Sequence, residues 1–184
     1  MPHTVRAAVV GVPVPSLEIV LGTLAWVVGA AGLDAGAGTL LVALGLGLAG
    51  WLWSVRHRRR AMAVQLHPAR RTRMQRLIAA GVIGLFLFPI LLSLISYGEL
   101  GTALSAALIG VLLIMASTVL EERSLVAVGA LVLVLAAVGA FLALNSPGVS
   151  QSQPVIGLGC GLVLWVAGMR RLGLLDELRR RVRR

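Results

Sequence analysis

The chain has 184 residues, of which 58% are hydrophobic and only 13% charged, and its mean hydropathy is +0.94. Soluble domains are about half apolar and about a quarter charged, so this composition excludes a water-solvated domain and predicts a membrane protein. The net charge is +10, and all 17 basic residues are arginine, which is typical of GC-rich bacterial genomes. The single cysteine, Cys160, excludes an intrachain disulfide.

Six apolar segments match, or come close to, the length of a helix that crosses a bilayer, about 17–25 residues. In chain order they are residues 16–33, 36–55, 77–97, 102–120, 124–144 and 154–169. The third contains Pro89, which predicts a kink that membrane helices tolerate. The sequence therefore predicts an all-α, polytopic integral membrane protein with about six transmembrane helices, forming a single domain over residues 1–184.

The first apolar segment admits a second interpretation. Arg6, the apolar stretch and the small residues at 29–31 are also compatible with a secretory signal peptide. Two features favour a helix that remains in the membrane: the apolar stretch is long, and Pro13 and Pro15 stand just before it, where proline suits a helix start. Glu18 is then expected at a shallow, interfacial depth near the start of this helix.

Arginine is distributed unevenly among the connecting segments. Every arginine falls in the segments on one side of the predicted bundle: residues 1–15, 56–76, 121–123 and 170–184. The segments on the other side contain none: 34–35, 98–101 and 145–153. Because Lys and Arg near helix ends concentrate on the cytoplasmic side, we predict three antiparallel hairpins in the cell (inner or plasma) membrane, with both termini cytoplasmic.

Tryptophans are expected at the same cytoplasmic interface. Trp51, Trp53 and Trp165 lie near the predicted inner ends of the second and sixth helices, where amphipathic rings favour the headgroup level. Trp26 is the exception, because it falls near the middle of the first helix. It is expected either between helices or facing lipid.

The hairpins also show internal similarity. Residues 44–56 align with residues 158–170 at six positions, which include Gly47 with Gly161 and Trp51 with Trp165. This predicts a hairpin repeat around an axis along the membrane normal. In architecture the chain resembles HdeD-type acid-resistance membrane proteins. In size and helix count it is similar to the substrate-binding subunits of energy-coupling-factor vitamin transporters. Neither resemblance rests on a motif, so neither assigns a residue.

The residue types that usually carry chemistry lie outside the apolar segments. His3, His57 and His67 are all in predicted loops, which argues against a haem or metal site within the bundle. No acidic residue lies at mid-membrane, where coupled transporters usually carry one. Serine and threonine hydroxyls within the helices are expected to bond to their own backbone. The sequence therefore predicts no enzyme activity, no catalytic or metal-binding residue and no cofactor.

Glycine and arginine supply the remaining candidates. Small residues four apart let helices approach closely, and the predicted packing residues are Gly45, Gly47, Gly110, Gly157 and Gly161. The arginines of the loop 56–76 and of the tail are predicted to contact anionic lipid headgroups or an acidic partner protein. These are Arg56, Arg58, Arg59, Arg60, Arg70, Arg71, Arg73, Arg76, Arg179, Arg180 and Arg181.

The loop and the tail are expected to differ in structure. The basic loop contains no Phe, Tyr or Trp for base stacking, which argues against nucleic acid. The tail 170–184 is predicted to form an amphipathic helix whose apolar face carries Leu174, Leu175, Leu178 and Val182.

Together these patterns predict a non-enzymatic accessory, scaffold or stress-related membrane protein. It would act through helix packing and through contacts with lipids, with other membrane proteins or with further copies of the chain. A transporter component or small-solute-binding subunit is the alternative, and it requires a cavity lined by the glycine-rich helices.

Overall fold

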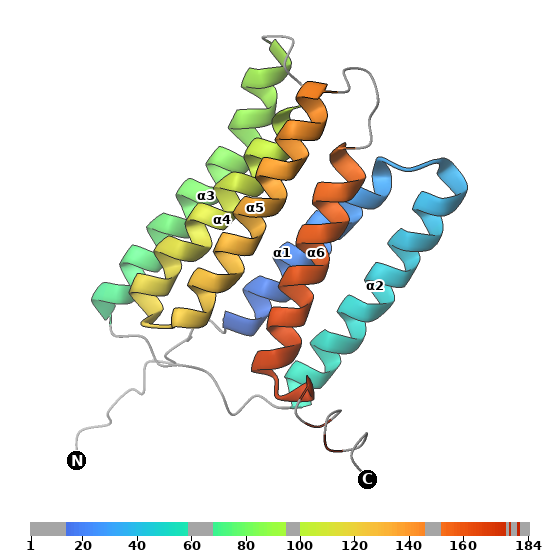
Figure 1. Cartoon of the computed structure of the whole chain (residues 1–184). Helices are drawn as coiled ribbons and strands as arrows, with labels where there is room; N and C mark the ends of the chain where they lie inside the picture. Colours follow the sequence, from blue (N-terminus) through green and yellow to red (C-terminus); the bar gives the residue numbers. More distant parts are fainter. Residues whose placement is uncertain are drawn as a thin grey trace, which may run out of the picture.

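The computed structural model describes residues 14–58, 68–94, 100–145, 152–175, 177 and 180, and within them it contains six α-helices and no strand. The helices form one bundle (Figure 1). Their bounds are α1 Val14–Ala31, α2 Ala35–Arg58, α3 Pro68–Leu94, α4 Gly101–Leu120, α5 Arg123–Asn145 and α6 Ser152–Arg171. The prediction of an all-α fold is confirmed.

The helices extend beyond the apolar segments at the arginine-rich boundaries. α2 continues to Arg58 and α3 starts at Pro68, so much of the segment predicted as the loop 56–76 is helical. Hydropathy marks where the hydrocarbon ends, whereas a helix continues as long as its residues favour it. Arginine, alanine, methionine and glutamine are good helix formers, and proline suits a first turn.

Four helices are long and apolar enough to cross a membrane: α2, α4, α5 and α6. The apolar part of α1, Ser16–Ala31, is shorter. Leu40, Leu94, Leu144 and many similar side chains are exposed on the outside of the bundle. Such extensive apolar exposure is unfavourable in water and is normal for a surface that faces lipid.

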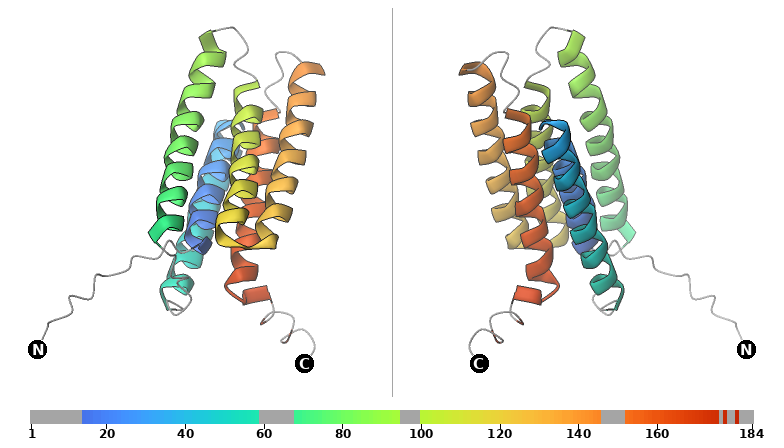
Figure 2. Two further views of the ribbon diagram at one scale, coloured as in Figure 1. Left: turned by 90° about the vertical axis from the view of Figure 1, so that its left-hand side faces the viewer. Right: turned by 90° about the vertical axis from the view of Figure 1, so that its right-hand side faces the viewer.

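The closest helix contacts lie between the predicted hairpins rather than within them. α1 packs most extensively against α6, and α4 against α5, with each pair antiparallel (Figure 1). α2 packs mainly on α1, and α3 mainly on α4. These two helices therefore occupy edges of the bundle, α2 in Figure 1 and α3 in both views of Figure 2.

The buried side chains form two clusters. The larger joins α4, α5 and α6 and includes Leu125, Val132 and Leu164. The smaller cluster lies between α1, α2, α6 and the start of the tail, and contains Ile19, Leu52, Trp165, Leu172 and Leu174. Leu174 thus packs on the bundle, after a turn at Gly173, whose φ of 70° favours glycine.

Candidate functional site

All the exposed arginines among the described residues gather at one end of the bundle, which we call the basic end. Here α1 begins, α2 ends, α3 begins, the α4–α5 turn lies and α6 ends (Figure 1). The exposed arginines are Arg58, Arg73, Arg76, Arg123, Arg170 and Arg180. The opposite end carries Asp34 and Asn145, and no arginine occurs in its described residues.

An ion cluster lies just inside the basic end, with Glu18 buried and Glu122 partly exposed. Glu18 of α1 is 1% exposed, and its Oε1 lies 2.8 Å from Nε of Arg171, the last residue of α6. Arg171 also donates through Nη1 to Glu122 Oε2 and through Nη2 to Ser124 Oγ, at 2.8 Å for the latter. The hydroxyl of Ser124 donates in turn to Glu122 Oε1 over 3.0 Å. One guanidinium therefore joins α1, α6 and the α4–α5 turn.

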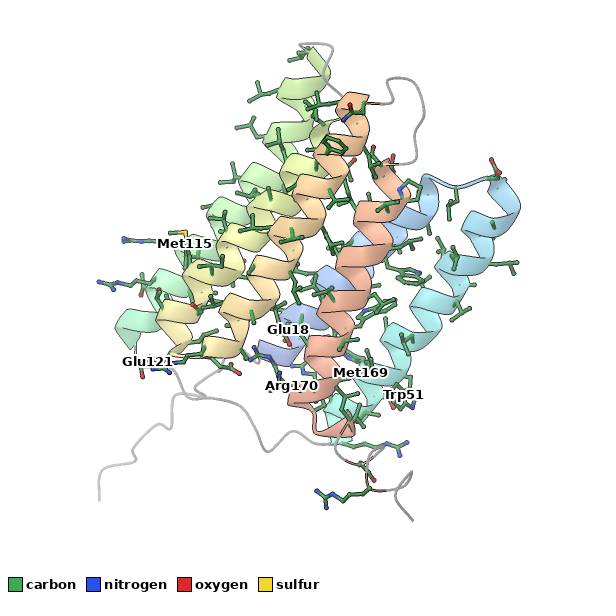
Figure 3. The ribbon with its side chains drawn as sticks, in the orientation of Figure 1. Glu18, Trp51, Met115, Glu121, Met169 and Arg170 are labelled. Carbon is green, nitrogen blue, oxygen red and sulfur yellow. The ribbon has the colours of Figure 1, made fainter. Side chains whose placement is uncertain are left out.

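The turn between α4 and α5 is shaped to bring Glu122 to this cluster. Glu121 ends α4 in the left-handed conformation, with φ 55°, and its N–H donates to the carbonyl of Ser117. The N–H of Glu122 donates to the same carbonyl, and α5 starts at once with Arg123. Figure 3 shows Glu121, Glu18 and Arg170 together at this end of the bundle.

The cluster holds two carboxylates and one guanidinium, a formal net charge of minus one when all three are ionised. Neither oxygen of Glu18 receives a well-directed hydrogen bond from the described residues, so its pairing with Arg171 is mainly electrostatic. Removing one partner of a buried ion pair leaves an uncompensated charge and is strongly destabilising. The arrangement is therefore suited to holding three helix ends in one relative position.

Sequence reasoning missed this cluster. Glu18 was expected at a shallow, interfacial depth with no partner named for it, and Arg171 was grouped with the tail whose arginines face headgroups and cytosol. The sequence of α6 does indicate that Arg171 points into the bundle. The residues of its small-residue face and this arginine lie on one side of the helix: Gly157, Gly161, Gly168 and Arg171. That face packs on α1, so Arg171 points inward while its neighbour Arg170 is exposed.

Glycines make the contact between α1 and α6 possible. A Cβ atom placed on Gly29 would lie 2.5 Å from the backbone nitrogen of Leu158 and 2.8 Å from Cα of Gly157. One placed on Gly161 would lie 2.9 Å from the carbonyl oxygen of Gly22. Real Cβ atoms do not approach so closely, so the two backbones touch along a run of small residues, as in GxxxG crossings.

The other predicted packing glycines divide into two groups. Gly110 faces Gly129 across the α4–α5 contact, and Gly45 lies under the ring of Trp26. Gly47 is different, because it is exposed and a Cβ there would meet nothing within 4 Å. The packing role predicted for Gly47 is wrong. Its proposed repeat partner, Gly161, is buried, so these two positions are not equivalent in the folded chain.

Trp26 and Trp165 pack against each other between helices. The rings of Trp26 and Trp165 are tilted at 32° with centroids 4.9 Å apart. Trp26 Nε1 donates to the carbonyl of Leu41 over 2.8 Å and so links α1 to α2. Trp165 is only 2% exposed, which corrects its expected interfacial position. The glycine at position 22 leaves room for its ring beside α1.

Hydroxyls within the helices bond to their own backbone where the structure describes them. Thr23 donates to Ile19 O over 2.7 Å, Ser117 to Ile114 O over 2.6 Å, and Thr118 to Met115 O over 2.7 Å. These bonds satisfy each hydroxyl within the helix that carries it. The prediction that hydroxyls within the helices bond to their own backbone is confirmed for these residues.

The structure gives the positions of only some of the predicted lipid-contacting arginines. Arg58, Arg73, Arg76 and Arg180 are exposed at the basic end, and Arg56 is partly buried. Arg70 and Arg71 lie in the first turn of α3, and their side chains are outside the described part of the chain. Entirely outside it are Arg59, Arg60, Arg179 and Arg181, together with the tail residues Leu178 and Val182.

Two exposed tryptophans mark the end of α2. Trp51 is 49% exposed and Trp53 45% exposed, and both face outward from the bundle. The guanidinium carbon of Arg56 lies 4.6 Å from the centroid of the Trp53 ring, within the range of a cation–π contact.

Comparison with protein families, curated proteins and solved structures found no match to this chain.

Proposed function

We propose that this chain is a non-enzymatic, multi-pass protein of the cell membrane that serves as an accessory or scaffold subunit. In this proposal both termini are cytoplasmic, and the basic end rests on anionic lipid headgroups. The observation that carries the proposal is the separation of charge along the bundle axis, with every described arginine at the end where α1 begins and α6 ends. Positive charge near helix ends favours the cytoplasmic side.

Chain continuity supports six crossings. α2 and α4 are each long and apolar enough to span, and both run from the opposite end to the basic end (Figure 1). The chain must therefore return across the bilayer between them, and α3 runs in that direction. α1 must likewise bring the chain from the basic end to the start of α2. This order supports the proposed arrangement of three antiparallel hairpins.

Labelling from outside sealed cells tests this orientation. In a Cys160→Ala background, a cysteine at Ala35 is expected to react with a membrane-impermeant maleimide, whereas one at Glu121 is expected to react only after permeabilisation. Both positions are exposed, and they lie at opposite ends of the bundle. Labelling of position 121 in intact cells, with position 35 protected, would reverse the proposed orientation.

The packing of α1 on α6 favours the accessory role over a solute-binding one. A solute-binding subunit would need a cavity lined by the glycine-rich helices. At the α1–α6 crossing the glycine faces touch each other, and there is no room even for a methyl group at Gly29. Glu18 and Glu122 both form ion pairs with Arg171, so these charged groups already have partners within the chain.

An accessory role predicts a stable partner. Purification of the tagged, full-length chain in a mild detergent is expected to recover another membrane protein at a fixed ratio, or a defined homo-oligomer. The apolar outer faces of the helices are available for this contact, and those of α2, α3 and α5 are extensive. Recovery of a monomer that carries a bound small molecule instead would contradict the accessory role and favour the solute-binding alternative.

Lipid composition is expected to change the stability of the reconstituted protein. In nanodiscs of phosphatidylglycerol the melting temperature should exceed that in phosphatidylcholine, since each arginine near an anionic surface contributes about 1 kcal/mol. The difference should shrink as salt rises from about 0.01 M to about 1 M, where the screening length falls to about 3 Å. Equal melting temperatures at low salt would contradict the proposed headgroup contact.

A further inference from the structure

We infer that the bundle consists of two three-helix units that tilt against each other, and that the contact of Arg171 with Glu122 and Ser124 is the latch between them. The first unit contains α1, α2 and α6, and the second contains α3, α4 and α5. Figure 1 shows the second unit on the left and the first on the right. The inference goes beyond the proposed function, which requires no movement within the bundle.

Each unit is built around a pair of helices whose backbones touch. In the first unit, α1 and α6 meet at Gly29 and Gly157, where no methyl group fits. In the second unit, a Cβ atom on Gly110 would lie 2.9 Å from the carbonyl oxygen of Gly129, and one on Gly129 would lie 2.7 Å from that of Gly110. α2 then packs mainly on α1, and α3 mainly on α4. Such backbone contacts contain no side chain that could change rotamer to absorb a shift, so each unit is expected to move as one body.

The contact between the two units is made by apolar side chains instead. Where α5 meets α6, the side chain of Ile156 lies over Gly139, and a Cβ atom on Gly159 would lie 3.3 Å from Leu135 Cδ1. Leu164 of α6 belongs to the same buried cluster as the core residues of α4 and α5. Apolar contacts have no fixed bonding direction, and packed helices can slide past one another by small amounts. This seam therefore allows a small relative movement while it stays buried.

Arg171 makes directional contacts across the seam, at the basic end of the bundle. It belongs to the first unit, and its Nη1 and Nη2 donate to Glu122 and Ser124, which follow α4 and begin α5 in the second unit. The side chain of Glu122 is 41% exposed, so water can solvate it when this contact opens. Glu18 stays beside Arg171 Nε, at 2.8 Å, because both residues belong to the first unit. The latch can therefore open without leaving a buried charge unpaired.

Distance measurements between pairs of spin labels test the latch in the full-length protein, in a Cys160→Ala background. Labels that replace Arg58 of α2 and Arg76 of α3 report on the separation of the two units, whereas labels that replace Arg58 and Arg170 report on the first unit alone. All three positions are exposed at the basic end. Glu122→Ala is expected to broaden the distance distribution between positions 58 and 76 and to shift it to longer distances. The distribution between positions 58 and 170 should stay unchanged.

Arg123→Ala is the matched control, because Arg123 is exposed next to Glu122 and is not part of the latch. It should leave both distributions as they are in the otherwise unmodified chain. Ser124→Ala removes one acceptor but keeps both ion pairs, so it should broaden the distribution between the units less than Glu122→Ala does. If Glu122→Ala leaves the separation of the units unchanged, or broadens both distributions equally, the division into two units joined by a latch is overturned.

Discussion

Replacing Arg171 with methionine is expected to lower the free energy of unfolding by about 3–5 kcal/mol, the usual effect of breaking a buried ion pair. Methionine retains much of the apolar stem but leaves Glu18, at 1% exposure, without a counter-ion. Glu122 and Ser124 lose their shared donor at the same time. The measurement is thermal or denaturant unfolding of the purified chain in detergent.

Arg170→Met is the matched control for this prediction. The two arginines are adjacent on α6, but Arg170 is exposed, so its replacement should change the stability by no more than about 0.5 kcal/mol. Adding Glu18→Gln to Arg171→Met should restore part of the stability, because a neutral amide replaces the unpaired carboxylate. If both arginine variants melt together, or if the double variant is no more stable than Arg171→Met, the cluster does not hold the helix ends.

A single methyl group at Gly157 is expected to loosen the contact between α1 and α6. The added Cβ of Gly157→Ala would lie 2.6 Å from the carbonyl oxygen of Ala25 and closer still to the backbone of Gly29. Both neighbours are backbone atoms, so the helices must move apart. Overpacking of this kind costs about 1–3 kcal/mol.

Gly47→Ala makes the same chemical change where there is open space. Alanine favours a helix over glycine by up to about 1 kcal/mol, so this variant should melt at the same temperature as the wild type or at a higher one. The two variants are therefore expected to shift the melting temperature in opposite directions or, at least, by clearly different amounts. A stabilised Gly157→Ala protein would show that α1 and α6 do not cross as described.

The candidate functional residues were partly visible in the sequence. The gathering of arginine at one end of the bundle could be predicted. Hydropathy locates the helices, and successive connecting segments then lie at alternate ends of the bundle, so the position of each arginine-containing segment is known. The pairing of Glu18 with Arg171 could not, because 152 residues separate them along the chain. The glycine face of α6 marks Arg171 as the inward-pointing arginine, but it does not say which helix packs on that face. An acid within an apolar segment is an indication that a cation lies nearby, but it does not say which one.

The sequence by itself determined the fold class, the approximate course of the helices and the separation of charge along the bundle. These depend on properties that add residue by residue: apolarity over a stretch of chain, and the position of arginine between stretches. Only the tertiary structure decided that α1 packs on α6, that Trp165 is buried and that Gly47 faces outward. In a soluble protein a polar stripe would reveal the rotation of each helix. Here the helix surfaces facing lipid are as apolar as those facing other helices, so the rotation is determined by the fit between backbones at glycine contacts and by one buried ion cluster.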